Sequence, residues 1–176
     1  MMLYNTCGAN ISSHIRDSFV NYSSVAGLAN ALMMTGGAVA GIFFGRISKK
    51  LNDMILVLAC GFLFAGYMLL SFNQSSLIFI LISVFLAGCS LSFFLPRCIY
   101  GVSTYSDPTN SALTTLIISS VAPSMGGFAN PIIITRITNA LSPASTAFRY
   151  RFAGCTVLVL GIIIAIVTLA RSRKKA

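Results

Sequence analysis

The sequence predicts an all-α membrane protein, and three observations support that fold class. Hydrophobic residues make up 56% of the 176 residues and charged residues only 9%, whereas a soluble domain is roughly 25% charged. Five long apolar runs contain no charged residue, and no stretch alternates in hydropathy as the strands of a membrane β-barrel do. A soluble fold of this composition would leave too much apolar surface without polar cover. Lipid is therefore the expected surrounding of most of the chain.

The five apolar runs predict five complete transmembrane helices. Each run is close to the roughly 20 residues that a helix needs to cross the hydrocarbon core, where the backbone has to satisfy its own hydrogen bonds. The predicted spans are Ser24–Phe44, Met54–Phe72, Leu77–Leu95, Ala112–Ile134 and Phe152–Ala170. Asn52 and Asp53 suit the start of the second span as capping residues. The short link Asn73–Ser76 predicts that the second and third spans form a helical hairpin.

The lysines and arginines predict how these spans are oriented. If the spans alternate in direction, eight of the twelve basic residues lie on one side of the membrane. These eight are Arg46, Lys49, Lys50, Arg97, Arg171, Arg173, Lys174 and Lys175. The remaining four are Arg16, Arg136, Arg149 and Arg151. The positive-inside bias places the eight in the cytoplasm, so we expect a multi-pass plasma-membrane protein with a basic cytoplasmic tail over residues 171–176. Because this distribution accounts for the net charge of +9, no nucleic-acid partner is expected.

The N-terminal segment fits this topology only in part. Met1–Ile15 has neither the basic start nor the apolar core of a signal peptide, yet the alternation of the spans places it outside the cell. We therefore expect Met1–Ile15 to be the outer part of a sixth span whose inner part is missing, and the chain to be a fragment of a longer protein. Residues 1–176 would then form a single membrane domain.

Polar residues within the spans are the candidates for a functional site. The fourth span carries small and polar residues at helical spacing, and asparagines occur in the first span and the partial span. The candidate cavity-lining residues are Asn5, Asn10, Asn30, Thr115, Ser119 and Asn130. They line an aqueous cavity, or they form hydrogen bonds between packed helices. Both interpretations keep the asparagine amides away from lipid, where an unpaired amide is costly.

Glycines and prolines predict the shape of two spans. In the first span, Gly37, Gly41 and Gly45 repeat every four residues, which leaves one edge open to close approach or sliding of a neighbouring helix. The fourth span contains four residues that weaken or bend a helix: Pro123, Gly126, Gly127 and Pro131. Because each proline removes an internal hydrogen bond, we expect this span to be kinked.

Other chemistries find no support in the sequence. The spans contain no acidic residue that could relay protons or sodium ions. A group that couples transport to an ion would therefore lie elsewhere or be His14, for which an interfacial position is the more common interpretation. Nucleophile motifs, nucleotide-binding loops and paired carboxylates are absent, so no enzyme is expected. The five cysteines include no CxxC pair, so neither a metal site nor a cofactor is expected.

One segment resembles a known family motif. Gly41–Lys50 (GIFFGRISKK) resembles the loop motif Gly-x-x-x-Asp-Arg-x-Gly-Arg-Lys of the major facilitator superfamily, in the version found in the C-terminal half of those transporters. Four positions match the motif: Gly41, Arg46, Lys49 and Lys50. Gly45 replaces the acidic residue, and Ser48 replaces the second glycine.

Two further segments extend the resemblance over nearly the whole chain. Asp107–Ala112 is similar to the cytoplasmic loop before the eleventh span of that family, and Gly126–Pro131 to the glycine- and proline-rich stretch of that span. Met1–Ile15 then corresponds to the end of span seven, and the five complete spans to spans eight to twelve. Spans seven, eight, ten and eleven border the central cavity in this family, while nine and twelve are peripheral, in agreement with the purely apolar second and fifth spans here.

The resemblance implies a function for the parent molecule. It implies alternating access to a small organic solute at the bilayer midplane, with a missing N-terminal transporter half as partner and export as a candidate direction. Arg46, Lys49 and Lys50 would latch cytoplasmic helix ends in one state. The competing hypothesis is a truncated or stand-alone small membrane protein with a scaffold or assembly role and no transport. An oligomeric pore is disfavoured because the spans carry no ring of charges.

Overall fold

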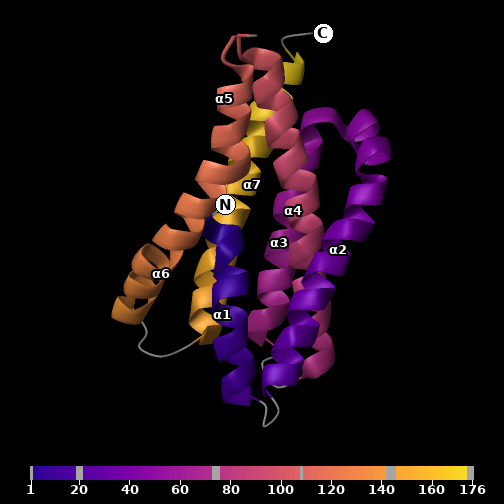
Figure 1. The fold of residues 1–176 in the computed structure, drawn as a ribbon. Coiled ribbons are helices and arrows are strands. Elements are labelled where there is room, and N and C mark those ends of the chain that lie inside the picture. Colours follow the sequence, from indigo (N-terminus) through magenta and orange to yellow (C-terminus); the bar gives the residue numbers. More distant parts are fainter. Residues whose placement is uncertain (1, 19–21, 73–75, 108, 142–145, 174–176) are drawn as a thin grey trace.

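The computed structural model describes residues 2–18, 22–72, 76–107, 109–141 and 146–173, and it is a bundle of helices (Figure 1). The α-helices are α1 (Met2–Ser18), α2 (Tyr22–Leu51), α3 (Ile55–Phe72), α4 (Leu77–Tyr105), α5 (Ser111–Leu116), α6 (Ala122–Leu141) and α7 (Thr146–Arg173). A short 3₁₀ turn, Asn52–Met54, joins α2 to α3, and a π-helical turn, Ile117–Val121, joins α5 to α6.

The predicted all-helical, membrane-type fold is confirmed. Within the described residues, four continuous helical stretches are long and apolar enough to cross a membrane: Ser23–Phe72, Leu77–Thr104, Ser111–Leu141 and Thr146–Arg171. The first is 50 residues long because it contains both α2 and α3, which run in opposite directions on either side of the 3₁₀ turn (Figure 1). It therefore holds two of the five predicted spans. In Figure 1, successive long helices run in opposite directions along the bundle, as the alternation of the predicted spans requires.

The reversal between α2 and α3 differs in detail from the prediction. Asn52 adopts a left-handed backbone conformation with φ of 49°, which asparagine tolerates better than most residues. The 3₁₀ turn has Leu51 at its N-cap and no side-chain capping hydrogen bond, so the predicted capping role of Asn52 and Asp53 is wrong. Both side chains instead accept hydrogen bonds from Arg97 of α4. They tie the turn to a neighbouring helix rather than cap their own.

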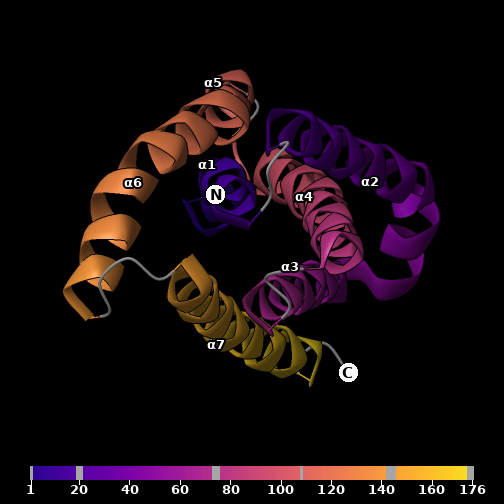
Figure 2. The same ribbon diagram turned by 90° about the horizontal axis from the view of Figure 1, so that it is seen from below.

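The helices pack in a continuous order from α2 to α7. α4 lies between α2 and α3, and α3 lies between α4 and α7 (Figure 2). The extensive packing of α3 on α4 agrees with the predicted hairpin, although residues 73–75 of its link lie outside the described residues. α1 lies inside the arc of the other helices and contacts α6, α2 and α7. With 17 residues, α1 is about 25 Å long, shorter than the hydrocarbon core.

The closest approach of two helices is that of α2 and α4. A Cβ atom added at Gly36 would overlap the carbonyl oxygen of Phe85, and one added at Gly88 would overlap the carbonyl oxygen of Met33. At Gly37 an added Cβ would lie 3.2 Å from Ser92 Oγ. The backbones therefore touch where neither helix has a side chain.

This contact does not continue along the predicted glycine edge. No described atom lies within 4 Å of a Cβ added at Gly41 or Gly45, and both residues are exposed. Of the three predicted glycines, only Gly37 lies in the contact, which is completed by the adjacent Gly36 and by Gly88. A four-residue repeat identifies one edge of a helix, but the crossing angle decides how far along that edge the neighbour stays close.

The two purely apolar spans differ in burial. α7 exposes branched aliphatic side chains along most of its length, including Val159, Ile162 and Ile166, so it has the surface of a lipid-facing helix. α3 is more enclosed, because Leu63 and Tyr67 are buried between α4 and α7. A helix that is apolar all round gives no sequence signal for which of its faces is covered.

The helix formed by α5, the π-helical turn and α6 bends away from the bundle. Figure 2 shows α5 and α6 as a curved arc that passes around α1. The π-helical turn lies directly before Pro123, which cannot donate a backbone hydrogen bond. Pro131 lies within α6 without ending it. A π-bulge followed by a proline is a known physical cause of helix bending.

Candidate functional site

A buried polar network joins α1 to α6 inside the bundle. Thr6 of α1 donates a hydrogen bond from its hydroxyl to Asn130 Oδ1 of α6 at 2.9 Å, and both residues are buried. One turn along α1, Asn10 donates from Nδ2 to the backbone carbonyl of Thr6 at 2.9 Å. Asn5 donates from Nδ2 to the carbonyl oxygen of Pro123 at 3.2 Å. Two adjacent polar residues of α1, Asn5 and Thr6, thus bond to α6, and Asn10 lies one turn farther along α1.

The sequence of α1 explains why this face is polar. Thr6, Asn10 and His14 follow one another at four-residue spacing, so they share one face of the helix. The adjacent face carries Cys7, Ile11 and Ile15, which are buried in the main hydrophobic cluster, together with aromatic and aliphatic residues of α3, α4 and α7. α1 therefore has a polar stripe next to an apolar one, and neighbouring helices cover both.

Arg149 extends the network to α7. Its Nη1 donates to Asn10 Oδ1 at 3.1 Å, and its Nη2 donates to Asn139 Oδ1 at 2.9 Å. One guanidinium therefore links the first turn of α7 to α1 and to the end of α6. Planar guanidinium groups suit such paired contacts because their donors diverge in a fixed geometry. Both acceptors are neutral amide oxygens.

An aromatic layer lies beside these polar groups. His14 packs edge-on against Tyr150, with ring centroids 5.5 Å apart, and Tyr150 stacks on Tyr67 of α3 at 5.9 Å. All three side chains are almost completely buried. The hydroxyl of Tyr67 donates to the backbone carbonyl of Leu3. The layer connects α1, α3 and α7 and closes the network on its apolar side.

Three buried polar atoms of this region have no hydrogen-bond partner among the described residues. They are Asn130 Nδ2, Arg149 Nε and Tyr150 Oη. Buried polar atoms are paired in the great majority of cases, because an unpaired one costs about 1–3 kcal/mol. Their occurrence together, on two helices that both contact α1, distinguishes this region from the rest of the bundle.

The predicted cavity-lining residues separate into two groups. Asn5 and Asn130 lie at the α1–α6 contact, where the backbone of Gly127 also approaches: a Cβ added there would lie 3.4 Å from Asn5 Nδ2. Gly126 is buried on the same helix. Asn10 joins the same network one turn farther along α1, through Arg149 of α7. The second group does not join them. Asn30 is exposed on α2, and Thr115 and Ser119 are half-buried at and just before the π-helical turn.

Sequence reasoning missed several members of the network. The sequence patterns do not indicate Thr6, Asn139 or Tyr150, and they place Arg149 among the basic residues that flank a span. The four-residue spacing of Thr6, Asn10 and His14 was an available signal for the polar face of α1. No comparable signal marked Arg149, because α7 begins at Thr146, six residues before the apolar run that predicted it.

The family-like segment lies at the opposite end of the bundle, at the end of α2. Arg46, Lys49 and Lys50 are exposed there. The adjacent ion pair joins Arg97 to Asp53, and the Arg97 guanidinium also lies 5.1 Å from the ring centre of Tyr100. This end of the bundle therefore carries a basic surface beside an ion pair that joins α4 to the α2–α3 turn.

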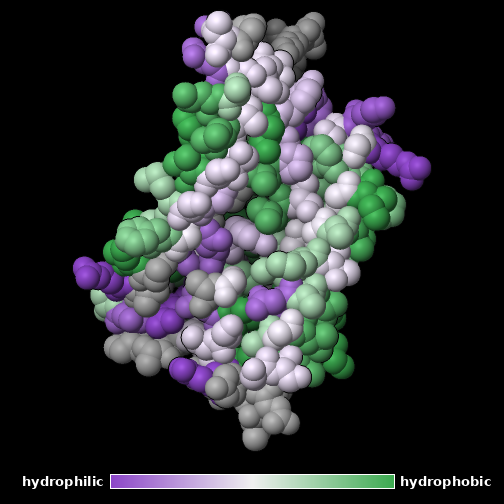
Figure 3. Space-filling view, in the orientation of Figure 1, coloured by the Kyte–Doolittle hydropathy of each residue, from purple (hydrophilic) through white to green (hydrophobic). Residues whose placement is uncertain are grey.

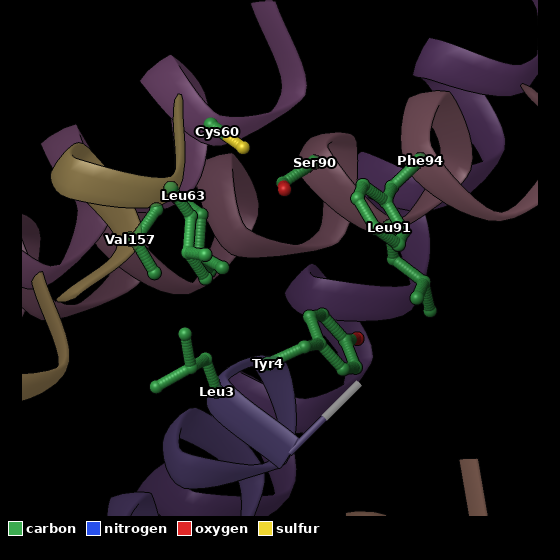
Figure 4. Close-up of a pocket in the computed structure, with 9 residues that line it drawn as sticks. Leu3, Tyr4, Cys60, Leu63, Ser90, Leu91, Phe94 and Val157 are labelled. Carbon is green, nitrogen blue, oxygen red and sulfur yellow. The ribbon is translucent and has the colours of Figure 1, made fainter. Parts of the chain in front are cut away.

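A small cavity of about 90 Å³ lies beside the start of α1 (Figure 4). Its walls come from α1, α3, α4 and α7, and are formed by Leu3, Tyr4, Cys60, Leu63, Ser90, Leu91, Phe94, Val157 and Leu160. The Ser90 hydroxyl already donates to the carbonyl of Ala59 at 2.8 Å. Ligand pockets usually exceed about 300 Å³ and contain several polar groups that orient the ligand. The polar network is therefore the stronger candidate site.

Comparisons with known proteins assign no family. No family model matches the sequence, no curated protein matches it, and no solved structure matches its fold. The structure itself supports a multi-pass helical membrane protein, because its long apolar helices suit a lipid bilayer. Any more specific function rests on the polar network and on the sequence segments described above.

Proposed function

We propose that this chain takes part in the transport of a small organic solute across the plasma membrane, as one six-helix half of a secondary transporter similar to the major facilitator superfamily. The observation that carries the proposal is the polar network between α1, α6 and α7. Polar groups inside a membrane bundle are expensive, and they commonly mark the path of a solute or ion. Here they include three buried atoms without a partner.

The shape of α6 supports movement at this site. α6 contacts α1 along the network, but its contact with α7 is much smaller than the contact between α3 and α7. A π-helical turn and two prolines interrupt its backbone hydrogen bonding. By comparison, the helices α2, α4, α3 and α7 pack tightly on one another in this order, and we call these four helices the packed unit. Alternating access would then consist of movement of α6 and its partner helices against this packed unit.

A second six-helix half is the partner in this proposal. Figure 3 shows that the face over α1 is mainly white and pale purple along its middle, with green surfaces on both sides. A weakly polar band of this kind is poorly suited to lipid and well suited to a water-filled path between two halves. The basic end with Arg46, Lys49, Lys50 and Arg171 would face the cytoplasm.

The experiment is a two-sided accessibility test at position 130. The five native cysteines, Cys7, Cys60, Cys89, Cys98 and Cys155, are all free, so they are first replaced. Asn130→Cys is then exposed to a membrane-impermeant thiol reagent in right-side-out and in inside-out vesicles. Alternating access predicts labelling from both sides.

The matched control is Ala153→Cys. Ala153 is completely buried in the apolar cluster, so this variant should be labelled from neither side. Labelling of Asn130→Cys from one side only, or from neither, would contradict alternating access. The second of these results is the one expected for a static scaffold.

A further inference from the structure

The charge of the polar network points to the chemical class of its ligand. Arg149 places a guanidinium between three helices, and both of its acceptors among the described residues, Asn10 and Asn139, are neutral. Among the described side chains, no carboxylate pairs with it. A charge removed from water without a counter-charge is strongly unfavourable. The site therefore carries one positive charge that no described carboxylate balances.

The other end of the bundle provides a contrast within the same chain. Arg97 is also largely buried, with 11% of its side chain exposed, but it pairs with the carboxylate of Asp53. A partly buried arginine with a structural role thus has an acidic partner there. Arg149 has a comparable position between helices and lacks one.

The unpartnered atoms near Arg149 indicate the same polarity. Arg149 Nε and Asn130 Nδ2 can only donate hydrogen bonds, and the hydroxyl of Tyr150 can donate as well. A ligand that completes this set has to supply acceptors. Carboxylate and phosphate oxygens accept several hydrogen bonds at once and form stronger ones with guanidinium groups than neutral oxygens do.

The distances between these groups suit a small ligand. Asn130 contacts Thr6, and Arg149 contacts Asn10, one turn farther along α1. One turn of an α-helix is about 5.4 Å, so the two contacts lie within reach of one small organic molecule. Arg149 is itself only half-buried, which leaves its charge open to a ligand that enters from the adjacent end of the bundle.

We propose that the network binds an anionic group, and that the transported solute is an organic anion whose carboxylate or phosphate is held by Arg149. This proposal rests on the transport function proposed above. An anionic lipid headgroup offers the same oxygens, so the test has to separate a soluble anion from a lipid.

The test measures thermal unfolding of the full chain in nanodiscs. The discs contain phosphatidylcholine alone or phosphatidylcholine with phosphatidylglycerol. Sodium benzoate, sodium succinate and sodium phosphate are titrated against sodium chloride and tetraethylammonium chloride at equal ionic strength. We expect a saturable rise in the melting temperature with at least one of the three anions in the phosphatidylcholine discs, and none with the two chlorides.

Variants assign the effect to Arg149. Arg149→Gln should weaken the apparent affinity for that anion at least about tenfold, because the charge-assisted hydrogen bond is lost. The matched control is Arg151→Gln. Arg151 is a nearby arginine of α7 that is exposed and donates to Ser71 instead, so this variant should keep the affinity of the wild type.

Three results would overturn the proposal. The first is the absence of any anion-specific shift. The second is an equal shift in Arg149→Gln, which would leave Arg149 as a structural link between helices. The third is stabilisation by phosphatidylglycerol with no effect of soluble anions, which would assign the site to a lipid. Two-sided labelling of Asn130→Cys without an anion effect would remove this proposal but keep transport. An anion effect with one-sided labelling would keep the anion-binding site but remove transport, and with it the anion as a transported solute.

Discussion

The contact between α2 and α4 gives a sharp prediction about stability, tested with Gly88→Ala. A Cβ at this position would overlap the backbone carbonyl of Met33. Backbone cannot rotate away as a flexible side chain can, so the two helices have to separate. Separation also lengthens the 3.3 Å hydrogen bond that Cys89 Sγ donates to the carbonyl of Gly36. Overpacking of this kind costs about 1–3 kcal/mol.

The matched control is Gly41→Ala on α2. An added Cβ there has no described atom within 4 Å, so the variant gains only the helix propensity of alanine over glycine, about 0.5–1 kcal/mol. Both variants receive this gain, and their difference isolates the steric cost. For a protein of this size, 1 kcal/mol shifts the melting temperature by about 2–4 °C.

The assay is thermal unfolding of both variants in nanodiscs of one composition. Gly88→Ala should melt about 2–12 °C below Gly41→Ala, from the steric cost and the conversion above. Equal melting temperatures for the two variants would show that α2 and α4 do not touch through Gly88, and would refute the proposed packing of these helices.

Three further predictions concern other parts of the bundle. Asp53→Asn removes the ion pair with Arg97; because 47% of the Asp53 side chain is exposed, the loss of unfolding free energy should stay below about 1 kcal/mol and shrink in high salt. Asn130→Leu removes one hydrogen bond and one unpaired buried donor together, so unfolding free energy should change by less than about 1 kcal/mol while any solute flux is lost. The chain contains no tryptophan, so a single indole can report lipid contact: fluorescence of Ile166→Trp, at a side chain 61% exposed, should be quenched by brominated lipid, and that of Tyr67→Trp should not.

Each of these predictions has an outcome that would contradict it. A large, salt-independent loss of stability in Asp53→Asn would mean that its carboxylate is buried. Strong destabilisation of Asn130→Leu would show that the network serves packing. Quenching of both tryptophan variants, or of neither, would contradict the burial pattern of α3 and α7.

The sequence predicted the helices well and their ends poorly. Hydropathy shows which segments are apolar enough to lie in hydrocarbon, so the apolar runs located every long helix. The helices continue beyond those runs because polar residues also form helix: α2 extends to Leu51, α4 to Tyr105, and α7 starts at Thr146. The backbone reversal at Asn52 likewise depends on contacts with α4 that no local pattern shows.

The candidate site could be predicted only in part, for a related reason. Asn5, Asn10 and Asn130 stand out because amides are rare and costly in an apolar environment. Arg149 does not stand out, since flanking arginines are common and most of them face water. Whether such a residue turns inward depends on which acceptors the neighbouring helices offer, here Asn10 of α1 and Asn139 of α6. That arrangement of helices is visible only in three dimensions (Figure 2).

The most direct test of alternating access is a distance measurement between α6 and the packed helices. Spin labels are placed at Ile137 near the end of α6 and at Ile78 near the start of α4, both exposed. These two helix ends lie at the same end of the bundle (Figure 1). A reference pair at Ile42 of α2 and Ile166 of α7 lies within the packed unit. We expect two distance populations for the first pair, whose relative amounts change when the stabilising anion is added, and one population for the reference pair. A single, unchanging population for both pairs would contradict alternating access.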